Sequence, residues 1–68
     1  GAVDYEFPEE DIQVLLDLIM RRDPYVTDQQ WMYGYIRSKY NYLNAMAAKK
    51  GVPNRFSYLK GAVANDWG

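Results

Sequence analysis

Apolar residues recur with the spacing of a helix in three separate stretches of the 68-residue chain. The first stretch follows the i, i+3, i+4, i+7 pattern of one helix face at Ile12, Leu15, Leu16 and Ile19. Pro8 before this stretch and Asp23-Pro24 after it predict a helix from about residue 9 to residue 22. We expect this helix to be buried on two sides, because three further apolar residues widen the face: Val14, Leu18 and Met20.

A longer helix is predicted to follow and to end at Gly51, a residue typical of helix C-termini. The sequence Thr27-Asp28-Gln29-Gln30 is a capping-box pattern, in which Thr27 is the N-cap and Gln30 reaches back from the third helical position. Gly34 weakens the helix by about 1 kcal/mol, which leaves a kink or break there as an alternative. The main apolar stripe of this helix consists of Met32, Ile36, Tyr40, Leu43 and Ala47.

A third helix is predicted from about Arg55 to Asp66, with Asn54 in position to cap its start. Its apolar residues form a single stripe at Phe56, Leu59, Val63 and Trp67. Small residues beside this stripe, Gly61 among them, allow another helix to approach closely. No stretch of the chain alternates with the period of a strand. The sequence therefore predicts one all-α domain over residues 1–68, with three helices or, as the alternative, four.

The composition argues against catalysis and against a resident metal. His and Cys are absent, which removes imidazole bases, thiol nucleophiles, disulfides and the usual transition-metal ligands. The carboxylates at residues 9–11 lie where any helix start favours negative charge, and Ser38 and Ser57 have no His to activate them. The glycines are isolated and form no phosphate-binding loop. We therefore expect a protein that is not an enzyme and that uses no cofactor, metal or small-molecule substrate.

The sequence shows no signal for a membrane or for secretion. No apolar run approaches the roughly 18 residues that span a bilayer, and no signal-peptide pattern precedes the first helix. We therefore expect a cytoplasmic protein without a membrane partner. Gly1-Ala2 is typical of residues left after removal of an expression tag, and the chain ends abruptly at Trp67-Gly68. We accordingly expect one domain excised from a longer protein.

Charge is divided unequally between the two halves of the chain. Residues 1–34 carry two basic and eight acidic side chains, whereas residues 35–68 carry six basic side chains and one acidic one. Such asymmetry is typical of proteins whose basic part binds a polyanion. The alternative is that the two halves pair with each other in the fold. The six basic residues of the second half are Arg37, Lys39, Lys49, Lys50, Arg55 and Lys60.

Aromatic residues make up 16% of the chain, which is more than the core of so small a domain can bury. Five of the eleven crowd the second predicted helix: Trp31, Tyr33, Tyr35, Tyr40 and Tyr42. Tyr33 and Tyr40 share one face of this helix, and the other three share another. With Arg37 and Lys39 between them, the rings are candidates for stacking on nucleobases. Packing with the hydroxyls in water and contact with a protein partner are the alternatives.

The junction of the second and third predicted helices resembles the turn of a helix-turn-helix motif. Ala47 would pack beneath Gly51-Val52, as a small residue does in that motif. Ser57 stands where the motif usually has a β-branched residue, and an ordinary pair of helices joined by a glycine loop has nearly the same pattern. In a true motif the third helix would enter the major groove, where three side chains are available: Asn54, Arg55 and Lys60.

The segment NRFSYLKGAVANDW, residues 54–67, resembles the C-terminal motif of DnaD-like domains and related helical domains that end bacterial replication initiators. Its YLKGAVANDW portion is similar to the YLxxAxxxDW endings of plasmid and phage replication proteins. Those families have a tyrosine, an aliphatic residue four positions later and a tryptophan eight positions later. Tyr58 and either Ala62 or Val63 match, whereas Trp67 lies nine residues after Tyr58. The resemblance covers about 14 residues and implies binding to DNA or to replisome partners through this helix.

Two functions are consistent with these patterns. The first is a non-catalytic accessory domain of a bacterial, phage or plasmid DNA-replication or DNA-binding protein, which contacts single- or double-stranded DNA through its basic half. The second is a docking module for replication proteins or for copies of itself, without direct nucleic-acid contact. The predicted nucleic-acid contacts are Arg37, Lys39, Lys49, Lys50, Arg55, Tyr58 and Lys60. The predicted stacking or interface rings are Tyr33, Tyr35, Tyr40 and Tyr42.

Overall fold

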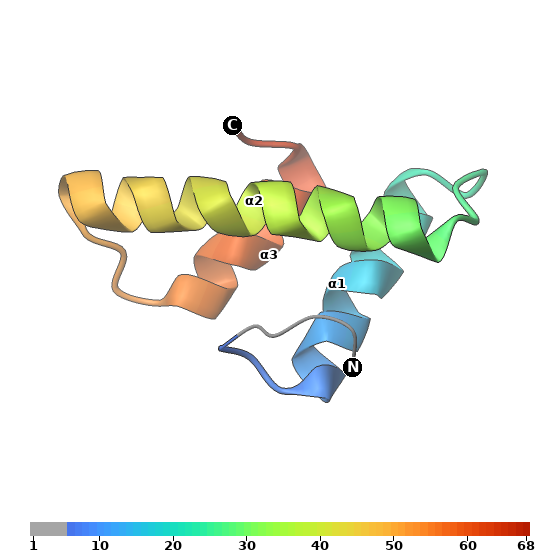
Figure 1. Ribbon diagram of the computed structural model, residues 1–68, viewed down its shortest axis with the longest axis horizontal. Helices are drawn as coiled ribbons and strands as arrows, with labels where there is room; N and C mark the ends of the chain where they lie inside the picture. The colour runs from blue at the N-terminus through green and yellow to red at the C-terminus, as the bar shows by residue number, and fades with distance from the viewer. Residues whose placement is uncertain (1–5) are drawn as a thin grey trace.

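The computed structural model describes residues 6–68, which form three helices and no strand (Figure 1). The helices are α1 (Glu9–Arg22), α2 (Gln29–Lys50) and α3 (Arg55–Asn65). The prediction of a small all-α fold is confirmed, and the described residues contain no fourth helix. The interpretation of Gly1-Ala2 concerns residues outside the described range. No helix in the described part of the chain is both long and apolar enough to cross a membrane.

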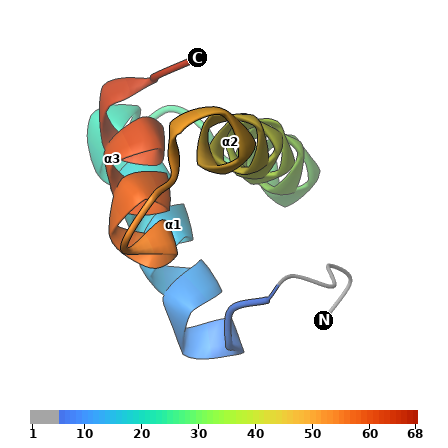
Figure 2. The ribbon, with the colours of Figure 1, turned by 90° about the vertical axis from the view of Figure 1, so that its left-hand side faces the viewer.

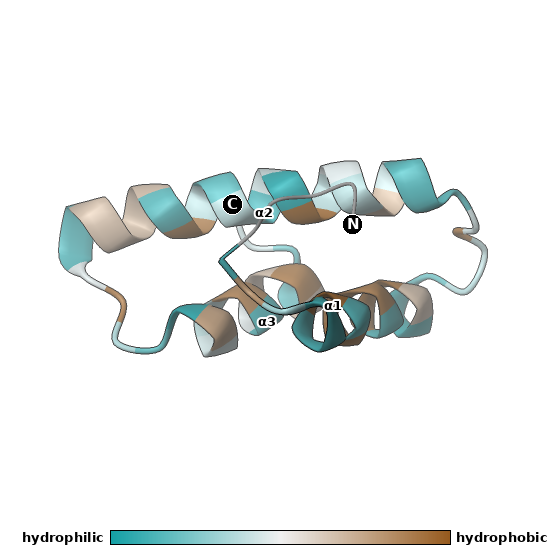
Figure 3. Ribbon diagram, turned by 60° about the horizontal axis from the view of Figure 1, so that its bottom comes forward, coloured by the Kyte–Doolittle hydropathy of each residue, from teal (hydrophilic) through white to brown (hydrophobic). Residues whose placement is uncertain are grey.

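The helices form two layers, with α2 alone in one layer and α1 and α3 together in the other (Figures 1 and 3). Each helix contacts the other two. Figure 3 shows hydrophobic residues of α2 on the side that faces α1 and α3, where the core lies. The largest fully buried side chains come from all three helices: Leu15, Ile36, Leu43, Leu59 and Val63.

Helix α1 buries one face rather than two. The predicted core face at Ile12, Leu15, Leu16 and Ile19 is buried, as expected. The expectation that α1 is buried on a second side is wrong, because Val14 and Met20 are 41% and 39% exposed. The buried residues of α1 lie on one side of the helix, and Val14 lies about 200° around the helix from Ile12. Leu18 is half-buried at the edge of the covered face.

Helix α2 begins one residue later than its capping pattern predicted. The N-cap is Asp28, whose carboxylate accepts hydrogen bonds from the backbone N–H groups of Gln30 (2.9 Å) and Trp31 (3.4 Å). The assignment of Thr27 as N-cap is therefore wrong. The helix continues unbroken through Gly34, so the alternative of a break there is wrong as well. It ends as predicted at Gly51, whose φ of +78° lies in a region that favours glycine.

Helix α3 is capped by Asn54, whose side chain accepts a hydrogen bond from the Ser57 N–H at 3.0 Å, as predicted. Leu59 and Val63 are fully buried, whereas Trp67 is 40% exposed. Trp67 leaves the apolar stripe because Asp66 adopts a left-handed backbone conformation (φ 56°) that ends the helix and redirects the chain. In Figure 2, which looks along α2, the C-terminal end lies at the top of the molecule and the start of α1 at the bottom.

Candidate nucleic-acid interface

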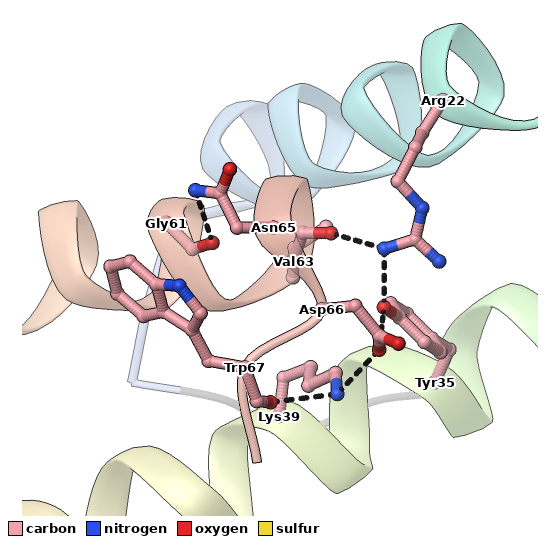
Figure 4. A network of polar contacts seen from close by, with 8 residues as sticks. All are labelled: Arg22, Tyr35, Lys39, Gly61, Val63, Asn65, Asp66 and Trp67. Atoms are coloured by element: carbon pink, nitrogen blue, oxygen red, sulfur yellow. Dashed lines mark hydrogen bonds and ion pairs between the residues drawn. The ribbon is translucent and has the colours of Figure 1, made fainter.

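The residues after α3 fold back onto α2 and are held there by polar contacts (Figure 4). Lys39, on α2, donates a hydrogen bond to the backbone carbonyl of Trp67 at 2.8 Å. Its ammonium also forms an ion pair with the Asp66 carboxylate at 2.8 Å. Lys39 is only 6% exposed, so this buried charge is paired inside the fold. The hydrogen bond from Lys39 lowers the pKa of Asp66, which keeps the carboxylate ionised at neutral pH.

The same carboxylate is linked to α1 through a tyrosine hydroxyl. Tyr35 donates a hydrogen bond to Asp66 at 2.6 Å, and Arg22 donates one to the Tyr35 hydroxyl at 2.6 Å. Arg22 also donates to the backbone carbonyl of Val63 in α3 at 2.9 Å. These contacts join the end of α1, the middle of α2 and the end of α3 (Figure 4). We call the side chains of Arg22, Tyr35, Lys39 and Asp66 the C-terminal anchor.

Five aromatic side chains lie in a row along the side of α2 that carries the C-terminal anchor. We call them the aromatic row: Trp31, Tyr35, Tyr42, Tyr58 and Trp67. Trp31 stacks on Tyr35 with ring centroids 5.3 Å apart and an interplanar angle of 16°. Trp67 contacts Tyr58 at 5.3 Å, and Tyr58 stacks on Tyr42 at 6.2 Å. The hydrogen bond between Tyr35 and Asp66, the neighbour of Trp67 in the chain, connects the two parts of the row.

Cationic groups lie over the tyrosines of this row. The Arg22 guanidinium is 5.1 Å from the centroid of the Tyr35 ring, and the Lys39 ammonium is 5.0 Å from the same centroid. The Lys50 ammonium is 5.7 Å from the centroid of Tyr58. All three distances are within the range of about 6 Å in which cation–π attraction is significant. The row therefore combines aromatic rings and positive charge on one surface.

The tyrosines on the other side of α2 have a different environment. The Tyr40 hydroxyl donates a hydrogen bond to the Glu6 carboxylate at 2.8 Å, and its ring meets Phe7 edge-on at 6.1 Å. Arg55 forms an ion pair with Glu6 at 2.7 Å and also hydrogen bonds to the side chain of Asn44. The hydrogen bonds from Arg55 lower the pKa of Glu6. These residues attach the segment before α1 to α2 and α3.

The structure separates the residues that the sequence grouped as one contact surface. Lys50, Tyr58 and Tyr42 come together, with both rings half-buried. Lys39 and Arg55 were predicted to contact nucleic acid. Lys39 is instead buried and Arg55 is paired with Glu6, so neither offers its charge to an external phosphate. Lys49 is exposed on α2 next to Lys50. The remaining predicted residues lie elsewhere: Tyr33 against the core, Arg37 exposed on α2, and Lys60 with its ammonium 5.3 Å from the Phe56 ring.

An ion pair joins the two halves of the chain. Among residues 6–68, the ion pair between Arg55 and Glu6 joins the basic half to the acidic half, whereas the pair between Lys39 and Asp66 lies within the basic half. Glu6 precedes α1, and within α1 Glu9 lies at the helix start, a position that favours negative charge.

Sequence reasoning missed three residues of this surface. Arg22 entered the sequence interpretation only as the last residue of the first predicted helix, and Asp66 only as the end of the third. Trp31 was noted beside the tyrosines but was not among the predicted contacts. Its signal was the spacing of four and eleven residues to Tyr35 and Tyr42, which places all three on one side of the helix.

Comparison with protein-family models, with curated proteins and with solved structures finds no match to this chain. Within residues 6–68, no three acidic side chains are grouped in a way that could hold a metal ion.

Proposed function

We propose that this chain is a non-catalytic domain that contacts nucleic acid through the aromatic row and the cations beside it. The observation that carries the proposal is the group formed by Lys50, Tyr58 and Trp67, in which a cation lies over one ring and that ring contacts a second, exposed one. Proteins that bind nucleic acid combine positive charges, which meet phosphates, with aromatic rings, which meet bases. Both kinds of group are present on this surface.

The cations that would meet phosphates are Lys49 and Lys50 at the end of α2, together with Arg22. Lys39 and Arg55 hold the fold together instead. Two acidic groups lie on this surface. Asp66 accepts contacts from Lys39 and lies close to Arg22, and Asp28 caps α2 beside Trp31. The surface around the row is therefore positive overall, as a polyanion requires.

The parent protein that we propose is a DNA-replication or DNA-binding protein of a bacterium, phage or plasmid. Support comes from the resemblance of residues 54–67 to the endings of replication initiators. In this fold Tyr58 and Trp67 of that segment belong to the aromatic row, and Asp66 belongs to the C-terminal anchor. The segment thus supplies both rings and the contact that positions one of them.

The competing function is docking to another protein. Trp, Tyr and Arg are enriched at the centres of protein interfaces, so the row also suits a protein partner. Sedimentation at several concentrations tests self-association. Oligomers that form without DNA, together with negligible DNA affinity, would favour docking over nucleic-acid contact.

The proposal is tested by titrating labelled single- and double-stranded DNA at about 50 and about 200 mM salt. We expect log K to fall by about 0.7 to 0.9 per phosphate contact for each tenfold rise in salt. The double variant Lys49→Gln, Lys50→Gln should weaken binding and reduce this slope by about 1 to 2. The matched control is Arg21→Gln, which removes an exposed cation from the outer side of α1 and should change neither quantity. Absence of binding at both salt concentrations would contradict the proposal.

A further inference from the structure

We propose that the nucleic acid is single-stranded and that its bases stack on the indole rings of Trp31 and Trp67. This inference rests on the proposed function, because it names the class of ligand and the residues that distinguish it. Both tryptophans of the chain belong to the aromatic row, one in each of its two parts. They are 48% and 40% exposed, which is unusual for the most hydrophobic ring system in a domain with so little core.

The indole of Trp31 is supported on one side and open on the other. Stacking on Tyr35 covers one face of the ring, and Tyr35 itself is fixed by its hydrogen bonds to Asp66 and Arg22. Trp31 belongs to the first turn of α2, directly after the Asp28 cap. A ring that is already stacked on another and held on a helix loses little conformational freedom when a base adds to the stack.

The indole of Trp67 lies flat against bare backbone. A Cβ atom added to Gly61 would come within 2.6 Å of Cη2 and 2.7 Å of Cζ3 of this ring, so the ring occupies space that only glycine leaves open. The backbone carbonyl of Trp67 accepts the hydrogen bond from Lys39, which fixes the main chain at the same residue. The ring is therefore supported by Gly61 and Tyr58 while a large part of its surface remains accessible.

A double helix does not fit this surface as well as a single strand. Bases in a duplex already stack on one another, so exposed indoles can stack only on unpaired bases or on bases forced out of the helix. The alternative is that α3 reads a major groove, but each of the three side chains available for that makes another contact within the fold. Asn54 caps α3, Arg55 pairs with Glu6, and the Lys60 ammonium lies over the Phe56 ring.

The length of the surface suits a short stretch of single strand. Trp31 and Lys50 are nineteen residues apart on one continuous helix, which corresponds to about 28 Å along its axis. A surface of that length accommodates on the order of four to eight nucleotides. Arg22 and Lys50 lie beside tyrosines of the row, where they can meet the phosphates between stacked bases.

Intrinsic tryptophan fluorescence tests this directly, since the chain has two tryptophans and both are proposed to stack. The whole chain is titrated with oligothymidylate, with an abasic oligomer of equal length and with a hairpin duplex. We expect oligothymidylate to quench the fluorescence and to bind about 5- to 150-fold more tightly than the abasic oligomer, as stacking of one or more bases predicts. The duplex should bind more weakly than oligothymidylate.

Variants then identify the rings. Trp31→Ala and Trp67→Ala should each lower affinity for oligothymidylate about 5- to 150-fold and leave the affinity for the abasic oligomer unchanged. Trp31→Phe keeps a ring and should restore part of the loss. The matched control is Tyr25→Ala, which removes an aromatic ring that is 93% exposed but lies outside the row, and which should change neither affinity. Circular dichroism verifies that each variant is folded.

The outcomes separate this inference from the proposed function. Equal affinity for oligothymidylate and for the abasic oligomer would overturn stacking while leaving nucleic-acid contact intact. Tighter binding of the duplex would overturn the assignment of a single strand. Loss of affinity for the abasic oligomer in both tryptophan variants would mean that the rings shape the surface and do not stack on bases. Absence of binding to all three oligomers would overturn the proposed function as well.

Discussion

The position of the Trp67 ring predicts opposite effects for two glycine-to-alanine substitutions. Gly34 and Gly61 both lie inside helices, where alanine is about 0.5 to 1 kcal/mol more favourable than glycine. An added Cβ at Gly34 meets no atom within 4 Å, so Gly34→Ala should gain the full amount. At Gly61 the same atom would lie 2.6 Å from Cη2 of the Trp67 ring, which must therefore move.

The expected change in stability for Gly61→Ala is the difference between two opposing effects. Forcing extra volume into a packed contact costs about 1 to 3 kcal/mol, which offsets or exceeds the gain in helix propensity. We therefore expect Gly61→Ala to range from neutral to about 2 kcal/mol destabilising, relative to the unsubstituted chain. Because about 1 kcal/mol corresponds to 4–8 °C in a domain of this size, the Tm values of the two variants should differ by at least about 4 °C.

The measurement is thermal unfolding monitored by circular dichroism, for chains that carry Trp67 and for chains with Trp67→Ala. In a Trp67→Ala background, Gly61→Ala should become as stabilising as Gly34→Ala, because the obstacle has been removed. The resulting double-mutant cycle should give a coupling of about 1 to 3 kcal/mol between Gly61 and Trp67. If Gly61→Ala stabilises the intact chain as much as Gly34→Ala does, the ring does not lie on Gly61, and its proposed preorganisation is refuted.

Three further predictions concern contacts at the chain ends and helix ends. Asp28→Ala should lower the free energy of unfolding in urea by about 0.5 to 2 kcal/mol, because it removes the N-cap of α2, whereas Thr27→Ala should change it little. Lys39→Met should increase quenching of tryptophan fluorescence by acrylamide, because the end of the chain loses its cation and hydrogen-bond donor. Hydrogen bonds from cationic side chains lower the pKa values of Glu6 and Asp66 below their usual 4.5 and 3.8. Groups with lowered pKa values stabilise the fold above those usual values and less as the pH falls, so Glu6→Gln with Asp66→Asn should reduce the loss of stability measured below about pH 5.

The helices could be predicted from sequence because their signals are local. The spacing of Ile12, Leu15, Leu16 and Ile19 placed α1 and its buried face correctly. The start of α2 was wrong by one residue because Thr27 and Asp28 are both good N-caps, and the backbone geometry that selects between them is not visible in the sequence. The prediction that α1 is buried on a second side was wrong because the apolar residues there were assumed to be covered by another helix.

The polar contacts of the candidate site could not be predicted in the same way, since they join distant parts of the chain. Lys39 meets Asp66 across 27 positions, and Arg55 meets Glu6 across 49. A signal for the burial of Lys39 was nevertheless present. Lys39 lies three residues after Ile36 and four before Leu43, so it belongs to the apolar stripe of α2 by spacing. Lys39 was predicted to contact nucleic acid because of its charge, and its position in the apolar stripe was not considered.

The burial of Lys39 bears on why Trp67 is held where it is. A methionine could fill the same position without placing a charge in the core, and the Asp66 carboxylate left without its cation would be 60% exposed, so no buried charge would remain unpaired. What the lysine adds is a donor for the Trp67 carbonyl and a cation for Asp66, which together fix the path of the chain after α3. Lys39→Met should therefore keep the helical content and the thermal stability close to those of the unsubstituted chain, yet lower the affinity for single-stranded DNA through Trp67. Unfolding of this variant would show that Lys39 is needed for the core itself, whereas a folded variant with unchanged affinity would show that the position of Trp67 does not matter for binding.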